Sequence, residues 1–170
     1  QMADEEVKEI LQQMMRQYEC MLRKEEKSYI GIGRCTKNMK CIAKSYRQAQ
    51  GVLKLQKRRN QNKTAIVYNE LGLYKLLLAM EDTEIVREYY MEMMGPLLKY
   101  DEAKQTDYCK VLECSLNHDG SVKEAAEELY VHRNTINKKI NKIEEITGFN
   151  LSSLDVRARF KIAFMIQEIL

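Results

Sequence analysis

The sequence predicts a mainly α-helical protein in which a small α/β segment precedes an all-α helix-turn-helix domain. Apolar residues recur at helical spacing along most of the 170-residue chain, and that period indicates amphipathic helices. The two segments with strand character, 28–34 and 64–68, both lie before residue 80. No strand is predicted after Asp82, so the two parts differ in fold class.

Residues 1–80 form the predicted α/β segment. Its first helix is expected at about 4–26, because five apolar residues are spaced by four and three: Val7, Leu11, Met14, Tyr18 and Met21. This stripe suits a domain core and also pairing with a second helix, and the core is the favoured interpretation. The glycine-containing segment 28–34 and the β-branched segment 64–68 predict strands. Helices are expected at about 39–59 and 71–80.

The second part is expected to be helical throughout, with helices at about 83–94, 102–117, 121–129, 133–147 and 154–170. The Gly95-Pro96 pair predicts a break after the first of these, because proline lacks an amide donor and disfavours helix in the residue before it. We therefore expect a connecting helix and linker at 81–101 and the helix-turn-helix domain at 102–170.

The helix at 121–129 has a defined start. Ser121 and Glu124 have the spacing of a capping box, in which the serine side chain accepts from a free amide and the glutamate reaches back to the serine N–H. Gly120 ends the preceding helix, as glycine commonly does. Ala126 is a small residue where this helix would cross the next one. These features predict the first helix of a helix-turn-helix.

The second helix is predicted at 133–147, after a turn at 130–131 and with His132 as its N-cap. One face carries four isoleucines that predict a buried surface: Ile136, Ile140, Ile143 and Ile146. The opposite face is basic and rich in asparagine, since residues 133–142 contain four basic residues and no acidic one. A helical hairpin with a solvated basic face is the alternative to a functional surface.

The side chains of this basic face suit recognition of duplex DNA. Asparagine and arginine pair bidentately with adenine and guanine edges in the major groove, and lysine and threonine hold phosphates. The preceding helix carries three glutamates, which predicts that only the second helix enters the groove. The predicted DNA-binding residues are Ser121, His132, Arg133, Asn134, Thr135, Asn137, Lys138, Lys139, Asn141 and Lys142.

The composition argues against other classes of protein. The five cysteines form no C-x-x-C pair, which suits a cytoplasmic protein, and no long uncharged apolar run predicts a membrane span. Gly31-x-Gly33 lacks the lysine of a phosphate loop, and His118 and His132 have no second pair of ligands at zinc-like spacing. The basic run at 54–63 is interpreted as a solvated helix end in preference to an auxiliary DNA contact. We predict no enzyme activity, no cofactor and no metal site.

Residues 125–140 read Ala-Ala-Glu-Glu-Leu-Tyr-Val-His-Arg-Asn-Thr-Ile-Asn-Lys-Lys-Ile. They closely resemble the helix-turn-helix signature of the PucR/CdaR-type bacterial regulators and, more distantly, the helix-turn-helix of the Fis family. Segments 95–101 and 145–151 resemble the flanks of that signature, so the resemblance covers about 95–170. Lys138-Lys139 departs from the Tyr-Arg that the family often has, which leaves the base preference open.

Residues 28–34, 45–49 and 64–68 resemble a strand, a helix and a strand near the end of the GGDEF-like domain that precedes this helix-turn-helix in many family members. The resemblance implies a truncated GGDEF-like segment at 1–80 and a chain that is a fragment of a longer regulator. It also implies a transcriptional regulator of a bacterial catabolic operon, with a small-molecule effector bound by a region outside this chain.

Sequence-specific DNA binding in transcription control is the leading hypothesis. The alternatives are a nucleoid or architectural DNA binder with weak sequence preference, and an interaction module for an acidic protein partner. A homodimer is expected, because one recognition helix reads too few base pairs to find an operator. Its contact is expected on the N-terminal stripe or, by preference, on apolar residues of the last helix: Phe160, Ile162, Phe164, Met165, Ile166 and Leu170.

Overall fold

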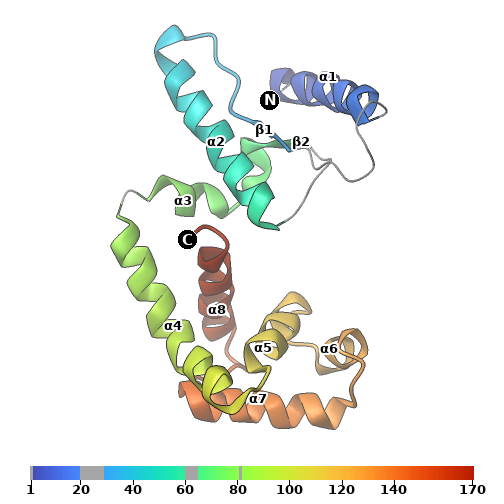
Figure 1. Cartoon of the computed structure of the whole chain (residues 1–170), viewed down its shortest axis with the longest axis vertical. Coiled ribbons are helices and arrows are strands. Elements are labelled where there is room, and N and C mark those ends of the chain that lie inside the picture. The colour runs from blue at the N-terminus through green and yellow to red at the C-terminus, as the bar shows by residue number, and fades with distance from the viewer. Residues whose placement is uncertain (1, 20–28, 60–64, 81) are drawn as a thin grey trace. The chain divides into compact units, whose positions relative to one another are not determined.

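The computed structural model describes residues 2–19, 29–59, 65–80 and 82–170 (Figure 1). The chain divides into two compact units, Gln1–Met80 with Ile169 and Glu81–Glu168 with Leu170. The prediction of a mainly helical protein is confirmed, and the described part of the first unit holds one small sheet. Each unit has its own apolar core, so each is considered by itself.

The first unit contains a parallel pair of short strands joined by a helix. The strands β1 (Ile30–Ile32) and β2 (Ala65–Val67) lie within the two predicted segments and are shorter than expected. Ile30 is opposite Ala65 and Ile32 is opposite Val67, and such parallel pairing needs a crossover connection. The helical elements of this unit are α1 (Met2–Glu19), η1 (Met39–Cys41), α2 (Ile42–Arg59), η2 (Tyr68–Leu71) and α3 (Tyr74–Ala79).

Gly31 in β1 and Gly33 directly after it allow α2 to lie against the strand. A Cβ atom on Gly33 would lie 2.0 Å from the carbonyl oxygen of Ser45, and one on Gly31 would lie 2.5 Å from that of Ala49. Both distances are shorter than the van der Waals contact distance between a carbon and an oxygen atom. The Gly-x-Gly pattern therefore has a packing cause, the close approach of two backbones.

The N-terminal helix contributes to the core of the first unit. Val7 and Leu11 pack against the buried residues Ile32, Ala65 and Val67, which supports the core interpretation for these two positions. Met14 is exposed. The side chains of the other two predicted stripe residues, Tyr18 and Met21, lie outside the described part of the chain, and so does the expected continuation of the helix to residue 26.

The second unit is an assembly of helices, and the described residues 82–170 contain no strand, as predicted. Its core is one cluster of buried apolar side chains with Phe149 packed edge-on against Phe160, ring centroids 5.7 Å apart. The helices are α4 (Thr83–Lys104), α5 (Tyr108–Asn117), α6 (Val122–Glu128), α7 (Arg133–Thr147) and α8 (Leu154–Gln167).

The predicted break at Gly95-Pro96 is wrong, because α4 continues through Pro96 to Lys104. A proline inside a helix removes one hydrogen bond and clashes with the carbonyl four residues earlier, at about 3 kcal/mol. Packing outweighs that penalty, since Met94 and Leu97 are fully buried in the core on either side of Pro96. The segment expected as a linker is thus the second half of a core helix.

The last helix offers less free apolar surface than the sequence indicates. Phe160 and Phe164 are buried in the core of the second unit, together with Ala163. Ile162 and Met165 remain half-buried. Phe160 and Phe164 are therefore not free to form the dimer contact that was expected on this helix.

Candidate nucleic-acid interface

Helices α6 and α7 are joined by a turn that depends on one left-handed residue. Tyr130 has a φ of 53°, and the following amide of Val131 donates to the carbonyl of Ala126 at 3.0 Å. Ala125 and Ala126 are buried beside α7, which agrees with the need for small residues where two helices cross. Tyr130 itself is 95% exposed. The turn therefore places α7 across α6 and leaves an aromatic side chain in solvent.

The predicted N-caps are present, with one difference in the capping box. Ser121 Oγ accepts from the amide of Glu124 at 3.4 Å, as predicted. The second predicted hydrogen bond, from the Ser121 amide to the Glu124 carboxylate, is wrong. The Ser121 amide donates instead to the carbonyl of His118 at 2.8 Å. The Glu124 carboxylate lies instead 3.3 Å from His118 Nδ1. At α7, His132 Nδ1 accepts from the Asn134 amide at 3.2 Å, which confirms the predicted cap.

One face of α7 is buried in the core of the second unit. Ile136 and Ile143 are fully buried, and Ile140 and Ile146 pack against the same core with partial exposure. The predicted isoleucine stripe is therefore confirmed. Because this face is fixed against the protein, the opposite face of α7 must point to solvent.

The opposite face of α7 presents open polar side chains. Asn134, Asn137, Lys138 and Asn141 follow at positions i, i+3, i+4 and i+7, so they share one face, and all four are exposed. Arg133 and Thr135 are exposed at the first turn of the helix. None of the six forms a side-chain hydrogen bond or ion pair with another described residue. We call these residues the open face: Arg133, Asn134, Thr135, Asn137, Lys138 and Asn141.

The other two lysines of α7 are tied to neighbouring side chains. Lys139 Nζ lies 2.7 Å from an oxygen of Asp107, just before α5, and the lysine side chain is only 26% exposed. Lys142 Nζ lies 2.9 Å from Glu145 and 5.8 Å from the ring centroid of Tyr100. Its hydrogen bond with Glu145 raises the pKa of Lys142. The predicted basic face is therefore divided into open and tied residues.

The helix in front of the helix-turn-helix is anchored by Asp101, the last residue of the segment 95–101 that resembles the lead-in of the family signature. Asp101, near the end of α4, accepts from the amides of Tyr108 and Cys109 at 3.0 and 2.8 Å and from the hydroxyl of Thr106 at 2.6 Å. Burial alone raises the pKa of Asp101, but these bonds outweigh it and hold the pKa below its usual value. Asp101 thereby fixes the start of α5 on α4. The resemblance of segment 95–101 included Asp101 but assigned it no role.

The capped pair of helices, the buried isoleucine face and the open polar face define a helix-turn-helix domain. Residues 108–166 match the PucR C-terminal helix-turn-helix domain. Residues 108–166 therefore form a helix-turn-helix domain of the PucR type, and the resemblance noted in residues 125–140 is confirmed.

Three relatives are known regulators. The chain is 33% identical over 141 residues to the proline-responsive transcriptional activator PutR of Bacillus subtilis, covering 82% of this chain and 34% of PutR. It is 26% identical over 127 residues to the DNA-binding transcriptional activator AdeR of the same organism, covering 74% of this chain and 30% of AdeR. It is 26% identical over 128 residues to the carbohydrate diacid regulator of Escherichia coli, covering 75% of this chain and 32% of that regulator. The chain thus spans about a third of the length of these relatives.

A transmembrane helix needs about 20 predominantly apolar residues. Within the described residues, no helix combines that length with sufficient apolar character.

Proposed function

We propose that this protein is a DNA-binding regulator of transcription that reads its operator with α7 in the major groove. One observation carries the proposal: the open face of α7 lies opposite a fully buried isoleucine pair and exposes arginine and asparagine together. Those are the side chains that pair bidentately with guanine and adenine. The relatives PutR and AdeR are named as transcriptional activators, which supports the same function.

The open face suggests a division of roles. Asn134, Asn137, Asn141 and Arg133 are the proposed base contacts, because their donors and acceptors are unused within the described structure. Lys138 and Thr135 suit phosphates, and so does the imidazole edge of His132 that is not occupied by its cap. Ser121 lies at the start of α6, where the first helix of such a domain crosses the DNA backbone.

The two tied lysines are proposed as weaker contributors. Lys139 would have to leave Asp107 before it could neutralise a phosphate, and Lys142 would have to leave Glu145. Each keeps a compensating carboxylate beside it in the free protein. Their share of the salt-dependent affinity should therefore be smaller than that of Lys138 or Arg133.

The relatives indicate the setting of this function. PutR is named proline-responsive, and the Escherichia coli relative is named a carbohydrate diacid regulator. We propose by analogy a cytoplasmic regulator of a catabolic operon, with a small-molecule effector bound outside this chain. Residues 1–80 are proposed to be the end of a GGDEF-like domain. The connecting helix proposed at 81–101 packs into the same core as the DNA-binding domain proposed at 102–170. A homodimer is proposed, because two half-sites supply the sequence information that one helix lacks.

The decisive experiment is selection of random duplex DNA by the full chain, followed by competition between selected and scrambled duplexes in fluorescence anisotropy. A regulator is expected to prefer the selected site by roughly 10³-fold or more. Equal affinity for both duplexes would identify an architectural binder instead. No binding at about 50 mM salt would exclude DNA as the partner and leave an acidic protein.

The matched control uses two exposed lysines of the second unit, one inside the open face and one outside it. Lys138→Ala is expected to weaken binding to all duplexes, whereas Lys104→Ala, at the end of α4, should leave it unchanged. Equal losses in the two variants would mean that binding follows net charge and not the open face.

A further inference from the structure

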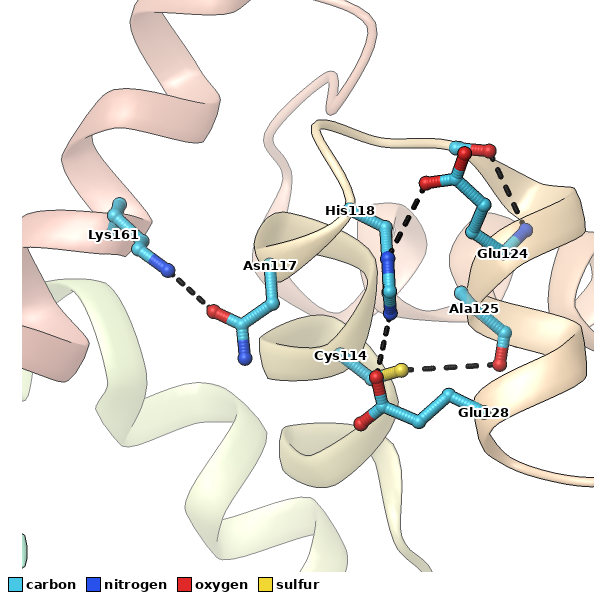
Figure 2. Close-up of polar contacts among 8 residues, drawn as sticks. Cys114, Asn117, His118, Glu124, Ala125, Glu128 and Lys161 are labelled. Atoms are coloured by element: carbon cyan, nitrogen blue, oxygen red, sulfur yellow. Dashed lines mark hydrogen bonds and ion pairs between the residues drawn. The ribbon is translucent and has the colours of Figure 1, made fainter.

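A second group of polar side chains lies between α5 and α6, away from the open face. Cys114 and His118 are four residues apart at the end of α5, and Glu128 lies at the end of α6. The Cys114 Sγ, one imidazole nitrogen of His118 and one carboxylate oxygen of Glu128 all lie within 4.8 Å of one another. Figure 2 shows these three side chains converging between the two helices.

The contacts within this group are short. His118 Nε2 lies 2.5 Å from Glu128 Oε2, and its Nδ1 lies 3.3 Å from Glu124 Oε2. The Cys114 thiol donates to the carbonyl oxygen of Ala125 at 3.8 Å. Cys114 is buried, His118 is half-buried and Glu128 is exposed, so the group has a thiol at its floor and a carboxylate at its solvent side (Figure 2).

We propose that Cys114, His118 and Glu128 bind a divalent transition-metal ion, zinc by preference, through Sγ, Nε2 and a carboxylate oxygen. Thiolate sulfur, imidazole nitrogen and carboxylate oxygen are the three ligand types that zinc takes in proteins. Two anionic ligands and one neutral ligand balance the charge of the ion. With three protein ligands, water completes the tetrahedron.

The geometry requires only a small adjustment. Ligand atoms around one tetrahedral zinc ion lie about 3.5 Å from one another, given bond lengths of about 2.0–2.3 Å. The present separations reach 4.8 Å at most, so the group must open at the short His118–Glu128 contact and close toward the sulfur. The Glu128 side chain is exposed and is therefore free to rotate to the new position.

Glu124 supplies the outer partner that such a site needs. A metal-bound imidazole nearly always donates its second ring N–H to a carboxylate, a carbonyl or water, which fixes the ring and its tautomer. In this group Nδ1 of His118 already faces the Glu124 carboxylate at 3.3 Å. The histidine therefore presents Nε2, and not Nδ1, to the sulfur and to Glu128.

Metal binding must displace protons from this group. Burial, together with the Glu128 carboxylate, raises the pKa of the Cys114 thiol, and the hydrogen bond with Glu128 raises the pKa of His118. The ion replaces the thiol proton, and also the imidazolium proton where the histidine is charged, and both pass to the solvent. Affinity should therefore increase with pH.

A metal ion at this position would join the end of α5 to α6, the first helix of the helix-turn-helix. The joint would add to the contacts that set the orientation of α6 without touching the open face of α7. The proposed metal site does not depend on DNA binding. The metal-binding proposal and the DNA-binding proposal can therefore fail independently of each other.

The test is titration of the reduced, chelator-treated full chain with Co²⁺ and Zn²⁺. One equivalent of Co²⁺ should give a thiolate-to-cobalt charge-transfer absorption, and one equivalent of Zn²⁺ should bleach it. Glu128→Gln is expected to weaken Zn²⁺ binding by tenfold or more, and Cys114→Ser should abolish the charge-transfer band. Glu127→Gln and Cys109→Ser are the matched controls on the same two helices, and both should bind as the parent chain does.

A last variant isolates the thiol. With Cys20, Cys35, Cys41 and Cys109 replaced by serine, the band should persist, because Cys114 is then the sole thiol. Absence of an equimolar site in the parent chain would overturn the proposal, and so would a band lost in this variant and kept in Cys114→Ser. Glu128→Gln changes an exposed side chain. Its affinity for Zn²⁺ therefore tests the proposed site even if Cys114→Ser does not fold.

Discussion

The open face and the tied lysines of α7 contain similar residues but differ in what surrounds them. Lys138 is exposed and has no partner among the described residues, whereas Lys139, the next residue, lies 2.7 Å from Asp107. A basic helix is therefore not a uniform surface. Sequence position alone gives both lysines the same role, and the tertiary environment separates them. The following predictions test that separation together with the third surface of α7, its buried isoleucines.

The largest effect is expected from the buried surface. Ile143→Ala should lower the free energy of unfolding by about 2–5 kcal/mol, because it removes a fully buried aliphatic side chain and leaves a cavity. Lys138→Ala should change it by less than about 0.5 kcal/mol. Urea denaturation of both variants measures the difference. Similar losses would contradict the assignment of the two faces.

A smaller effect on a different quantity is expected from the asparagines. Asn137→Ala should reduce discrimination between the selected duplex and a single-base variant by about 1–3 kcal/mol at one base position, without a loss of stability. Repeating the DNA selection with this variant identifies the position. An unchanged selected sequence would show that Asn137 does not face a base.

The two neighbouring lysines provide the direct comparison. Lys138→Ala should weaken binding to every duplex and reduce the slope of log affinity against log salt by about 1. Lys139→Ala should change that slope less, and should lower the free energy of unfolding by at most about 1 kcal/mol through loss of the pair with Asp107. Asp107→Asn is the control for the pair: it should free Lys139 and bring its contribution to the slope closer to that of Lys138.

The smallest effect is a dependence of stability on pH in metal-free protein. Glu128 raises the pKa of His118 above its usual 6.5, and the same bond lowers the pKa of Glu128 below its usual 4.5. The contribution of His118 to the free energy of unfolding is complete below pH 6.5, and it is lost as the pH rises through the raised pKa of His118. The glutamate contribution is complete above pH 4.5 and is lost as pH falls through its lowered pKa. Glu124, Cys114 and Lys110 are the other titratable groups facing this pair.

The measurement is the unfolding midpoint of chelator-treated protein from pH 4 to pH 9. The pair should stabilise most between pH 4.5 and 6.5, where both contributions are complete. Glu128→Gln should flatten the profile above pH 6.5, and Glu127→Gln should not. A profile that is unchanged in Glu128→Gln would assign the pH dependence to other groups.

Features that depend on local sequence were predicted well. The bounds of α7, its isoleucine stripe and the His132 cap all follow from residues within a few positions of one another. Such signals are strong because helical period and end-capping are properties of a short segment. The resemblance of residues 125–140 to one family was specific for the same reason, since it rests on a contiguous signature.

Features that depend on distant residues were not predicted. Lys139 and Asp107 are 32 positions apart, and nothing in either segment indicates that they meet. The continuity of α4 through Pro96 likewise depends on core packing, which outweighs the local preference of proline.

The proline in α4 has a consequence for the order of folding during synthesis. A helix that contains an interior proline is unstable by itself, so α4 depends on its contacts with α7 and α8. Both partners leave the ribosome after α4 does. We therefore expect α4 to remain unformed early in translation, and the second unit to acquire its core in one late step, once α8 has emerged. Ribosome-bound nascent chains that stop before Leu154 should be cleaved by protease within α4, and chains that extend well past Gln167 should resist.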